Sequence, residues 1–252
     1  MSKKLEQEIE KIIHNEITAL NRSDIFRSPL VAYSSAHDIR YLKLKEIIGE
    51  WHLSPFDLLP DAKSIISYFV PFTKEVVHEP QRVKDGSHLW AEAYQVINIH
   101  FEHINEALSS YIISLGHSAK PIPATHTYDP KDMKCMWSHK SAAFIAGLGT
   151  FGANRLLITE RGSGGRFCTV LTSAPLKVKQ NPASDKCLSF SNDSCGLCHE
   201  ICPVNAFHFD DIDKFSCHRE LIKNRENLME NTMLKNVDIC GKCISICPFA
   251  FI

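Results

Sequence analysis

The segment from residue 187 onward holds eight of the chain's ten cysteines, arranged in two copies of one pattern. The first copy is Cys187, Cys195, Cys198 and Cys202, and the second is Cys217, Cys240, Cys243 and Cys247. Each copy ends in C-x2-C-x3-C-P and is preceded by one more distant cysteine. Two such runs predict two [4Fe–4S] clusters in a bacterial-ferredoxin-like fold. The sequence therefore predicts a protein that moves electrons.

The spacing within each run suits a cluster that needs four thiolates around one small volume. C-x2-C wraps a tight turn, and the proline after the last cysteine fixes φ and turns the chain away. In two-cluster ferredoxins that last cysteine binds the other cluster. One predicted quartet is therefore Cys187, Cys195, Cys198 and Cys247, and the other is Cys202, Cys217, Cys240 and Cys243. Asn192 stands where the compact form has its first cysteine, so Cys187 is the nearest upstream ligand.

Two other uses of these cysteines are less favoured. A structural zinc site does not usually repeat C-x3-C-P, and the chain has no paired H-x3–5-H. Disulfides need an oxidising compartment. The N-terminus has no apolar run typical of a signal peptide, so we expect a cytoplasmic protein. Cys135 and Cys168 lie outside the pattern, and Cys168 reads as a buried apolar side chain.

Composition restricts the class of protein and its partners. The chain has 252 residues, 44% hydrophobic and 23% charged residues, and a formal net charge of −1, as in soluble globular proteins. No apolar stretch is long enough to cross a membrane. A nucleic-acid-binding protein usually shows a basic excess, so the charge balance does not favour a tRNA partner.

Hydrophobic periodicity predicts a mixed α+β fold in two parts. Helices are expected over 3–20, 42–48, 90–115 and 137–146, and a buried strand over 64–72. Strands over 155–159 and 166–172 flank Gly-Ser-Gly-Gly and predict a hairpin. The wide gap before Cys240 fits an inserted helix beginning near Cys217. We expect an α/β domain over 1–178 and a double-cluster domain over 179–252, separated by a linker over 177–185.

A glycine loop follows the helix expected over 137–146. Gly147, Gly149 and Gly152 form a Gly-x-Gly-x-x-Gly string. A dinucleotide-binding loop follows a strand and opens a helix, whereas here a helix leads into a strand. The order therefore disfavours a nicotinamide site. Backbone without side chains can still lie close to a flat, bulky group.

The segment AGLGTFGANRLLIT at 146–159, then GSGGRFCTVLTSAPL, then the two cysteine runs, resembles the epoxyqueuosine reductase family. LLPDAKSIISYFVPF at 58–72 is similar to an early strand of that family. The resemblance implies a nitroreductase-like, cobalamin-binding domain followed by a ferredoxin-like module, as in related reductive dehalogenases. It also implies a short form without the C-terminal helical repeats that help longer members hold tRNA.

The family's site residues can be placed by position in this chain. Gly147, Gly149, Gly152 and Asn154 would lie against the corrin, and Tyr94 would stand in place of the family's Tyr-His pair. The family's acid corresponds to Asp132, one residue from the expected position. Ala153 stands where the family has a lysine.

Two functions remain open at this stage. The first is an enzyme in which the clusters feed electrons to a corrinoid that reduces a small molecule or a modified nucleoside, with ferredoxin or flavodoxin as external donor. Asp132 or Asp129 would then protonate the leaving oxygen, although Tyr-Asp-Pro-Lys is also ordinary turn chemistry. The second is an electron-transfer protein that holds no cobalamin and reduces a partner, for example a corrinoid enzyme.

Overall fold

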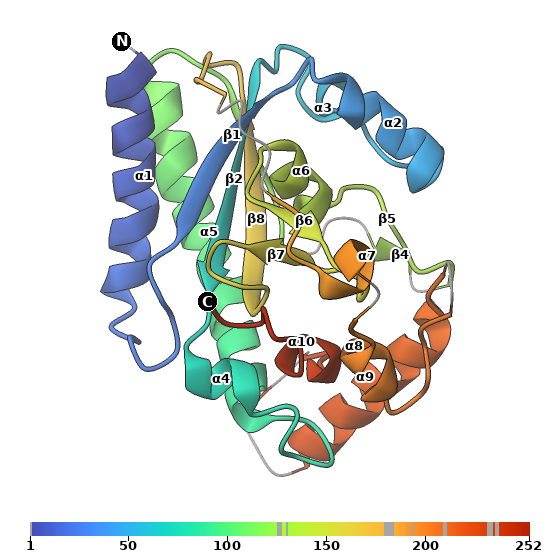
Figure 1. Ribbon diagram of the computed structural model, residues 1–252. Helices are drawn as coiled ribbons and strands as arrows, with labels where there is room; N and C mark the ends of the chain where they lie inside the picture. Colours follow the sequence, from blue (N-terminus) through green and yellow to red (C-terminus); the bar gives the residue numbers. More distant parts are fainter. Residues whose placement is uncertain are drawn as a thin grey trace.

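The computed structural model describes residues 2–124, 128–129, 131–178, 184–192, 194–208, 211–230, 234 and 237–252. Its fold is mixed α+β, as predicted, with helices on both sides of a central sheet (Figure 1). The helices are α1 (Ser2–Ala19), α2 (Ile39–Ile47), α3 (Pro55–Leu58), α4 (Lys74–His78), α5 (His88–Ser114), α6 (His139–Ile145), α7 (Leu188–Asn192), α8 (Leu197–Glu200), α9 (Lys214–Met229) and α10 (Lys242–Ser245). The strands are β1 (Leu30–Ser35), β2 (Ser64–Pro71), β3 (Ala119–Ile122), β4 (Tyr128–Asp129), β5 (Lys134–Cys135), β6 (Gly149–Phe151), β7 (Leu157–Thr159) and β8 (Gly165–Thr172).

The central sheet is antiparallel, with the strand order β1-β2-β8-β3. Every residue of β2 is buried, which confirms the buried strand predicted over 64–72. Because side chains alternate along a strand, β2 contributes to hydrophobic clusters on both faces of the sheet. Ile66 and Tyr68 pack toward α1 and α5, whereas Ile65 packs in a different cluster with Trp137.

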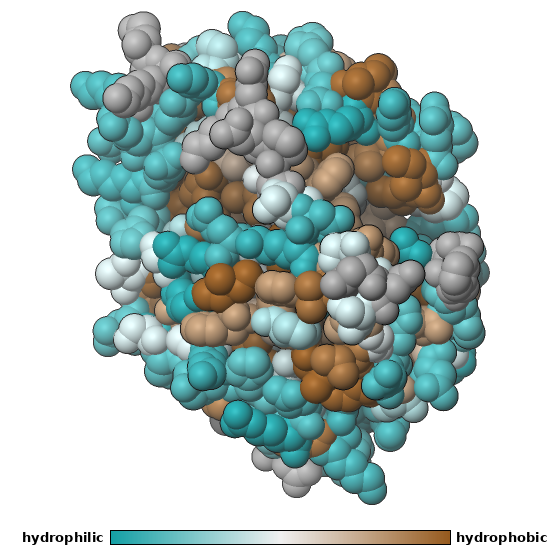
Figure 2. All heavy atoms as spheres, viewed as in Figure 1, coloured by the Kyte–Doolittle hydropathy of each residue, from teal (hydrophilic) through white to brown (hydrophobic). Residues whose placement is uncertain are grey.

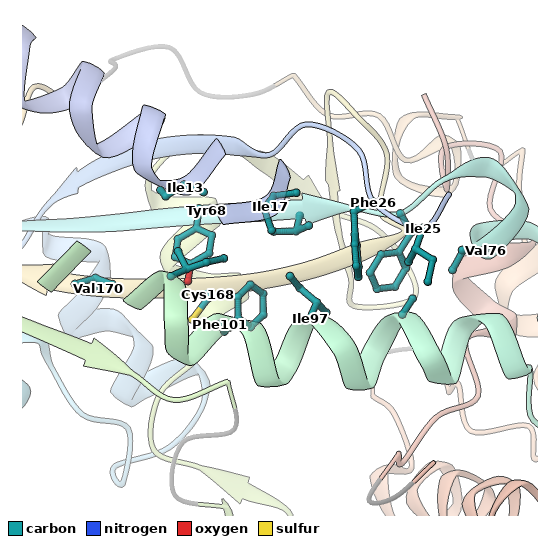
Figure 3. Close-up of a cluster of buried hydrophobic side chains, with 14 of the residues drawn as sticks. Ile13, Ile17, Ile25, Phe26, Tyr68, Val76, Ile97, Phe101, Cys168 and Val170 are labelled. Carbon is teal, nitrogen blue, oxygen red and sulfur yellow. The ribbon is translucent and has the colours of Figure 1, made fainter. Parts of the chain in front are cut away.

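The larger core lies between the sheet, α1 and α5. Figure 3 shows Ile13 and Ile17 of α1 together with Tyr68 of β2 and with Ile97 and Phe101 of α5. The helices predicted over 3–20 and 90–115 are therefore confirmed within a few residues at each end. α5 ends as predicted, because Gly116 follows it with a left-handed φ of 82°.

The same core extends into the cysteine-rich segment. Leu228 of α9, Val237, Ile239 and Ala250 belong to the cluster that contains the α1 and α5 side chains. These described parts of the cysteine-rich segment therefore pack against the N-terminal part of the chain. The predicted boundary between residues 178 and 179, and most of the predicted linker, fall at residues 179–183, which lie outside the described residues.

The hairpin predicted over 155–172 is wrong. β8 has β2 on one side and β3 on the other, so neither of its edges is open to β7. β7 instead pairs with β6, and the hairpin is formed by the glycine loop itself. The turn at 162–165 binds the end of the chain, since the N–H groups of Ser163 and Gly164 both donate to the carbonyl of Ala250.

Other predicted helices are confirmed, but they begin or end at different residues from those predicted. α2 begins at Ile39, earlier than predicted, because Asp38 caps it by accepting from the N–H of Arg40. α9 begins before Cys217, with Asp213 as its cap. β1 and β3 were not predicted. Among the described residues, no helix is long and apolar enough to cross a membrane.

Candidate functional site

The structure brings together the first predicted quartet of cysteines. Cys187, Cys195, Cys198 and Cys247 all line one small cavity beneath the glycine loop. Burial, followed by the neighbouring Cys247, Cys195 and Cys187, raises the pKa of Cys198 to about 11. Cys247 therefore lies with the cysteines of the first run, and not with the rest of its own run.

The second predicted quartet is also assembled. Burial, and then Cys240 and Cys202, raises the pKa of Cys217 to about 11. Cys243 interacts electrostatically with Cys240, Cys217 and Cys202, and its pKa is raised chiefly by burial. Cys243 also interacts with Cys198 of the first quartet, so the two quartets are neighbours. In Figure 1, α8 and α10, which carry cysteines of the two runs, lie side by side.

The chemistry of these donors suits iron–sulfur clusters. All ten cysteines have free thiols. Some of the sulfurs accept backbone hydrogen bonds, since the N–H of Ala153 lies 3.4 Å from Cys187 Sγ and that of Ala206 lies 3.3 Å from Cys202 Sγ. Such bonds stabilise thiolate charge and help to set cluster potentials. Because raised pKa values keep free thiols protonated, metal binding must release protons.

The arrangement differs from that around a single metal ion. Among the described residues, no group of three or more His, Cys, Asp and Glu side chains is placed to hold one ion. A cubane distributes its four thiolates over separate irons, so its ligands need not converge on one point. The two quartets therefore fit a pair of clusters by donor type and by grouping.

The first two glycines of the loop serve local structure. Gly147 follows α6 with a φ of 81°, and its N–H donates to the carbonyl of Phe144 at 3.0 Å. Gly149 lies in β6 opposite Thr159, where a Cβ atom would overlap the carbonyl of Ile158. Both positions need glycine for reasons that involve no ligand.

The end of the loop is tied to the cysteine cavity. A Cβ atom on Gly152 would lie 3.7 Å from Cys187 Sγ, an ordinary van der Waals distance, so this end of the loop lies directly against the first quartet. Asn154 is buried, and its Nδ2 donates to the carbonyl of Cys243 at 3.0 Å. Asn154 therefore joins the glycine loop to the run that holds the second quartet.

A larger cleft, of about 1190 Å³, opens on the other side of the loop. Leu30, Val31 and Ala32 of β1 line it together with Gly147 and Leu148. Charged side chains also line it, among them Glu10, Lys11, Glu160 and Lys177. Figure 2 shows apolar side chains recessed below a hydrophilic surface on this face of the molecule.

Comparison with known proteins places the fold. No family model matches the chain, and no curated protein matches it by sequence. An epoxyqueuosine reductase from Bacillus subtilis superposes with a TM-score of 0.57 at 18% identity, over 98% of this chain and 66% of its own. A catabolic reductive dehalogenase superposes with a TM-score of 0.60 at 17% identity, over 88% of this chain and 30% of its own. The chain has the fold of epoxyqueuosine reductases and reductive dehalogenases.

The epoxyqueuosine reductase fold is shared almost throughout this chain, which spans 66% of the length of those reductases. One of them, with a TM-score of 0.58 at 20% identity, is bound to an epoxyqueuosine-modified tRNA stem loop. One dehalogenase of the same fold is described as B12-dependent. The resemblance predicted from the sequence is confirmed at the level of fold.

The predicted acid lies at the surface of the reductase fold. Asp132 is in the turn between β4 and β5, and its carboxylate pairs with Lys134 Nζ at 2.6 Å. Asp129 is exposed, and its carboxylate accepts from the N–H of Lys131. Both aspartates therefore have the turn roles considered from the sequence. The Bacillus subtilis reductase has its aspartate-bearing catalytic loop swung out of the active site.

The predicted corrin contacts do not share one surface. Gly147 lines the large cleft, whereas Gly152 and Asn154 line the cysteine cavity. Tyr94 is half-buried on α5, under the guanidinium of Arg166 at 4.3 Å. Since they face two different cavities, and Gly149 and Tyr94 line neither, these residues as a set do not form one corrin cradle.

Proposed function

We propose that the chain is an iron–sulfur oxidoreductase that takes electrons from an external low-potential donor, such as ferredoxin or flavodoxin. The electrons would pass through two [4Fe–4S] clusters, one held by Cys187, Cys195, Cys198 and Cys247, and the other by Cys202, Cys217, Cys240 and Cys243. The observation that carries this proposal is the grouping of each Cys-Pro cysteine with the opposite run. Two-cluster ferredoxins bind their clusters in this way.

The chain's own residues would set the path of the electrons. The interaction between Cys198 and Cys243 makes the two quartets neighbours, which suits transfer from one cluster to the other. The link from Asn154 to the Cys243 carbonyl fixes the position of the second quartet relative to the glycine loop. Packing of Leu228, Val237 and Ile239 against the larger core holds the cysteine-rich segment in place.

The fold supports a reductase that binds its own corrinoid. The glycine loop supports the alternative, an electron-transfer protein that holds no corrinoid. A corrinoid would supply a strongly reducing metal centre for a small molecule or a modified nucleoside, and Asp132 is the proposed proton donor. The predicted contacts of the corrinoid line different cavities in this chain, so they do not define one site for it. An electron-transfer protein without its own corrinoid agrees with a loop whose glycines are occupied by local contacts.

One experiment tests the proposal and separates its two forms. The full chain is reconstituted anaerobically with iron and sulfide, incubated with cobalamin, and passed through gel filtration. Two clusters per chain with an equimolar corrinoid support the reductase, and two clusters without corrinoid support the electron-transfer protein. An iron content well below two four-iron clusters contradicts both.

A further inference from the structure

The last residues of the chain return to the loop that joins α1 to β1. Arg27 of this loop contacts them, since its Nη1 donates to the carbonyl of Ile252 at 2.8 Å and its guanidinium lies 4.1 Å from the centre of the Phe251 ring. Arg27 and Ile252 are 225 residues apart in the sequence. In Figure 1 the C-terminus lies near the lower end of the central sheet, where β1 begins. One side chain near the N-terminus therefore holds the C-terminal segment, residues 248–252.

Arg27 is itself fixed by two other parts of the fold. Its Nε donates to the carbonyl of Phe72, just after β2, at 2.9 Å, and its Nη2 donates to the carbonyl of Arg161, between β7 and β8, at 2.6 Å. Its backbone N–H donates to the carbonyl of Pro71 at 2.9 Å. A guanidinium presents several N–H donors in a rigid fork, so one side chain can join three carbonyls at once. Arg27 therefore ties the C-terminal segment to β2 and to the turn after β7.

The C-terminal segment begins next to Cys247. The N–H of Ala250 donates to the carbonyl of Cys247 at 2.9 Å, so a tight turn follows this cysteine. Phe251 and Ile252, which Arg27 holds, come directly after that turn. Little chain is therefore available to absorb a displacement, and a change in the position of Phe251 is passed to Cys247. Cys247 comes from the second run, so its place in the cavity of the first quartet depends on this segment.

The second quartet is held by different contacts. Asn224 of α9 donates from Nδ2 to the carbonyl of Ile239 at 3.1 Å, immediately before Cys240. Lys242 Nζ donates to the carbonyl of Val83 at 2.6 Å. Neither contact involves the C-terminal segment. The two quartets should therefore respond differently when that segment is released.

We propose that Arg27 is a positioning residue for the first cluster, because it holds the segment that places Cys247 against the other three thiolates of that quartet. This inference rests on the proposed function, since it presumes a [4Fe–4S] cluster bound by the first quartet. It makes the fourth ligand of that cluster depend on a side chain outside the cysteine-rich segment. The first cluster then needs the two parts of the chain to be docked, whereas the second cluster forms without Arg27.

The test compares anaerobically reconstituted full chains by iron content, EPR spectroscopy and an EPR redox titration. Arg27→Gln removes the charge and the fork of donors. Hydrogen bonds from a charged group contribute enough that docking of the C-terminal segment should weaken by roughly 10-fold to 100-fold. The first cluster should lose iron, give a three-iron signal and change its midpoint potential, while the second cluster stays unchanged. Arg27→Lys keeps the charge but not the fork, so it should lose less iron than Arg27→Gln.

Arg22→Gln is the matched control. Arg22 also lies between α1 and β1, and its guanidinium pairs with Asp24 at 2.9 Å and with Glu92 at 2.8 Å. Among the described residues it forms no hydrogen bond to the C-terminal segment. This variant should retain both clusters. Cys195→Ala and Cys240→Ala identify the EPR signals of the first and the second cluster.

Three results would overturn the inference. The first is that Arg27→Gln keeps two four-iron clusters with unchanged potentials. The second is that it loses iron equally from both clusters, which indicates general destabilisation. The third is that Arg22→Gln loses as much iron from the first cluster. If Arg27→Gln does not fold, Arg27→Lys is judged by the same three criteria. Iron is measured first in the unaltered chain, so two clusters there with an unaffected Arg27 variant contradict this inference alone, whereas an unaltered chain without clusters contradicts the proposed function.

Discussion

The turn at residue 162 should control whether Cys247 reaches the first quartet. The N–H groups of Ser163 and Gly164 donate to the Ala250 carbonyl at 3.1 and 2.9 Å, shortly after Cys247. Gly162 has a φ of 92°, and a Cβ atom there would lie 2.9 Å from Phe251 Cα and would overlap the Ala250 carbonyl. The Gly162→Ala change therefore strains the backbone and displaces the segment that follows Cys247.

The size of the effect follows from two terms. A left-handed φ costs an ordinary residue about 1–2 kcal/mol, and forcing an atom into a packed contact costs about 1–3 kcal/mol more. Gly116→Ala is the matched control, because Gly116 has a φ of 82° and nothing lies within 4 Å of an added Cβ. The control should show only the cost of the left-handed φ. The second term alone reduces the equilibrium constant for docking of the C-terminal segment by roughly 5-fold to 150-fold.

The assay is iron content with EPR spectroscopy on anaerobically reconstituted protein. Gly116→Ala should retain both clusters. Gly162→Ala should lose iron from the first cluster, with a three-iron signal, because one of its four ligands has moved. Equal stability and two intact clusters in both variants would refute the argument that this turn positions Cys247.

Three further predictions concern other parts of the chain. Cys168→Ala should retain both clusters, because Cys168 is buried in the larger core beside Asn105, whereas Cys202→Ala should lose iron; equal iron loss in both variants would contradict the quartet assignment. Tyr68→Phe should lower the free energy of unfolding by about 1–2 kcal/mol, because it removes the buried bond of 2.8 Å to Asn105. An unchanged apparent Tm of the Tyr68→Phe variant would contradict this prediction. Phe101→Tyr serves as a second variant in the same core. His52 is buried and stacked on Trp137, and burial lowers its pKa, so the folded chain holds it neutral. Unfolded His52 gains a proton as pH falls below about 6.5. Stability should therefore fall as pH drops from that value, and His52→Gln should flatten this part of a plot of Tm against pH.

The parts of the fold that sequence predicts well are those with strong local patterns. α1 and α5 have a clear period of apolar residues and β2 is a continuous apolar run, and each element is found where its pattern predicts it. The pairing of strands is different, because it depends on which edges are already occupied. β8 is covered on both sides, so β7 pairs with β6, and no local pattern around the turn at 162–165 indicates this.

In the candidate site, too, some features follow from a local sequence pattern and others do not. Cysteine spacing indicates the two quartets, since covalent geometry limits how thiols can surround a cluster. The Gly-x-Gly-x-x-Gly string alone does not reveal that Gly149 meets the steric needs of a tight hairpin, because this depends on its pairing with the strand that follows.

The most direct test of the central proposal is a crystal structure of the anaerobically reconstituted chain with iron located by anomalous scattering. The account predicts two four-iron clusters, with Cys247 bound to the cluster of Cys187, Cys195 and Cys198, and Cys202 bound to the other. Two results would contradict the account. The first is that Cys202 and Cys247 each bind the same cluster as the other cysteines of their own run. The second is a single metal ion in place of either cluster.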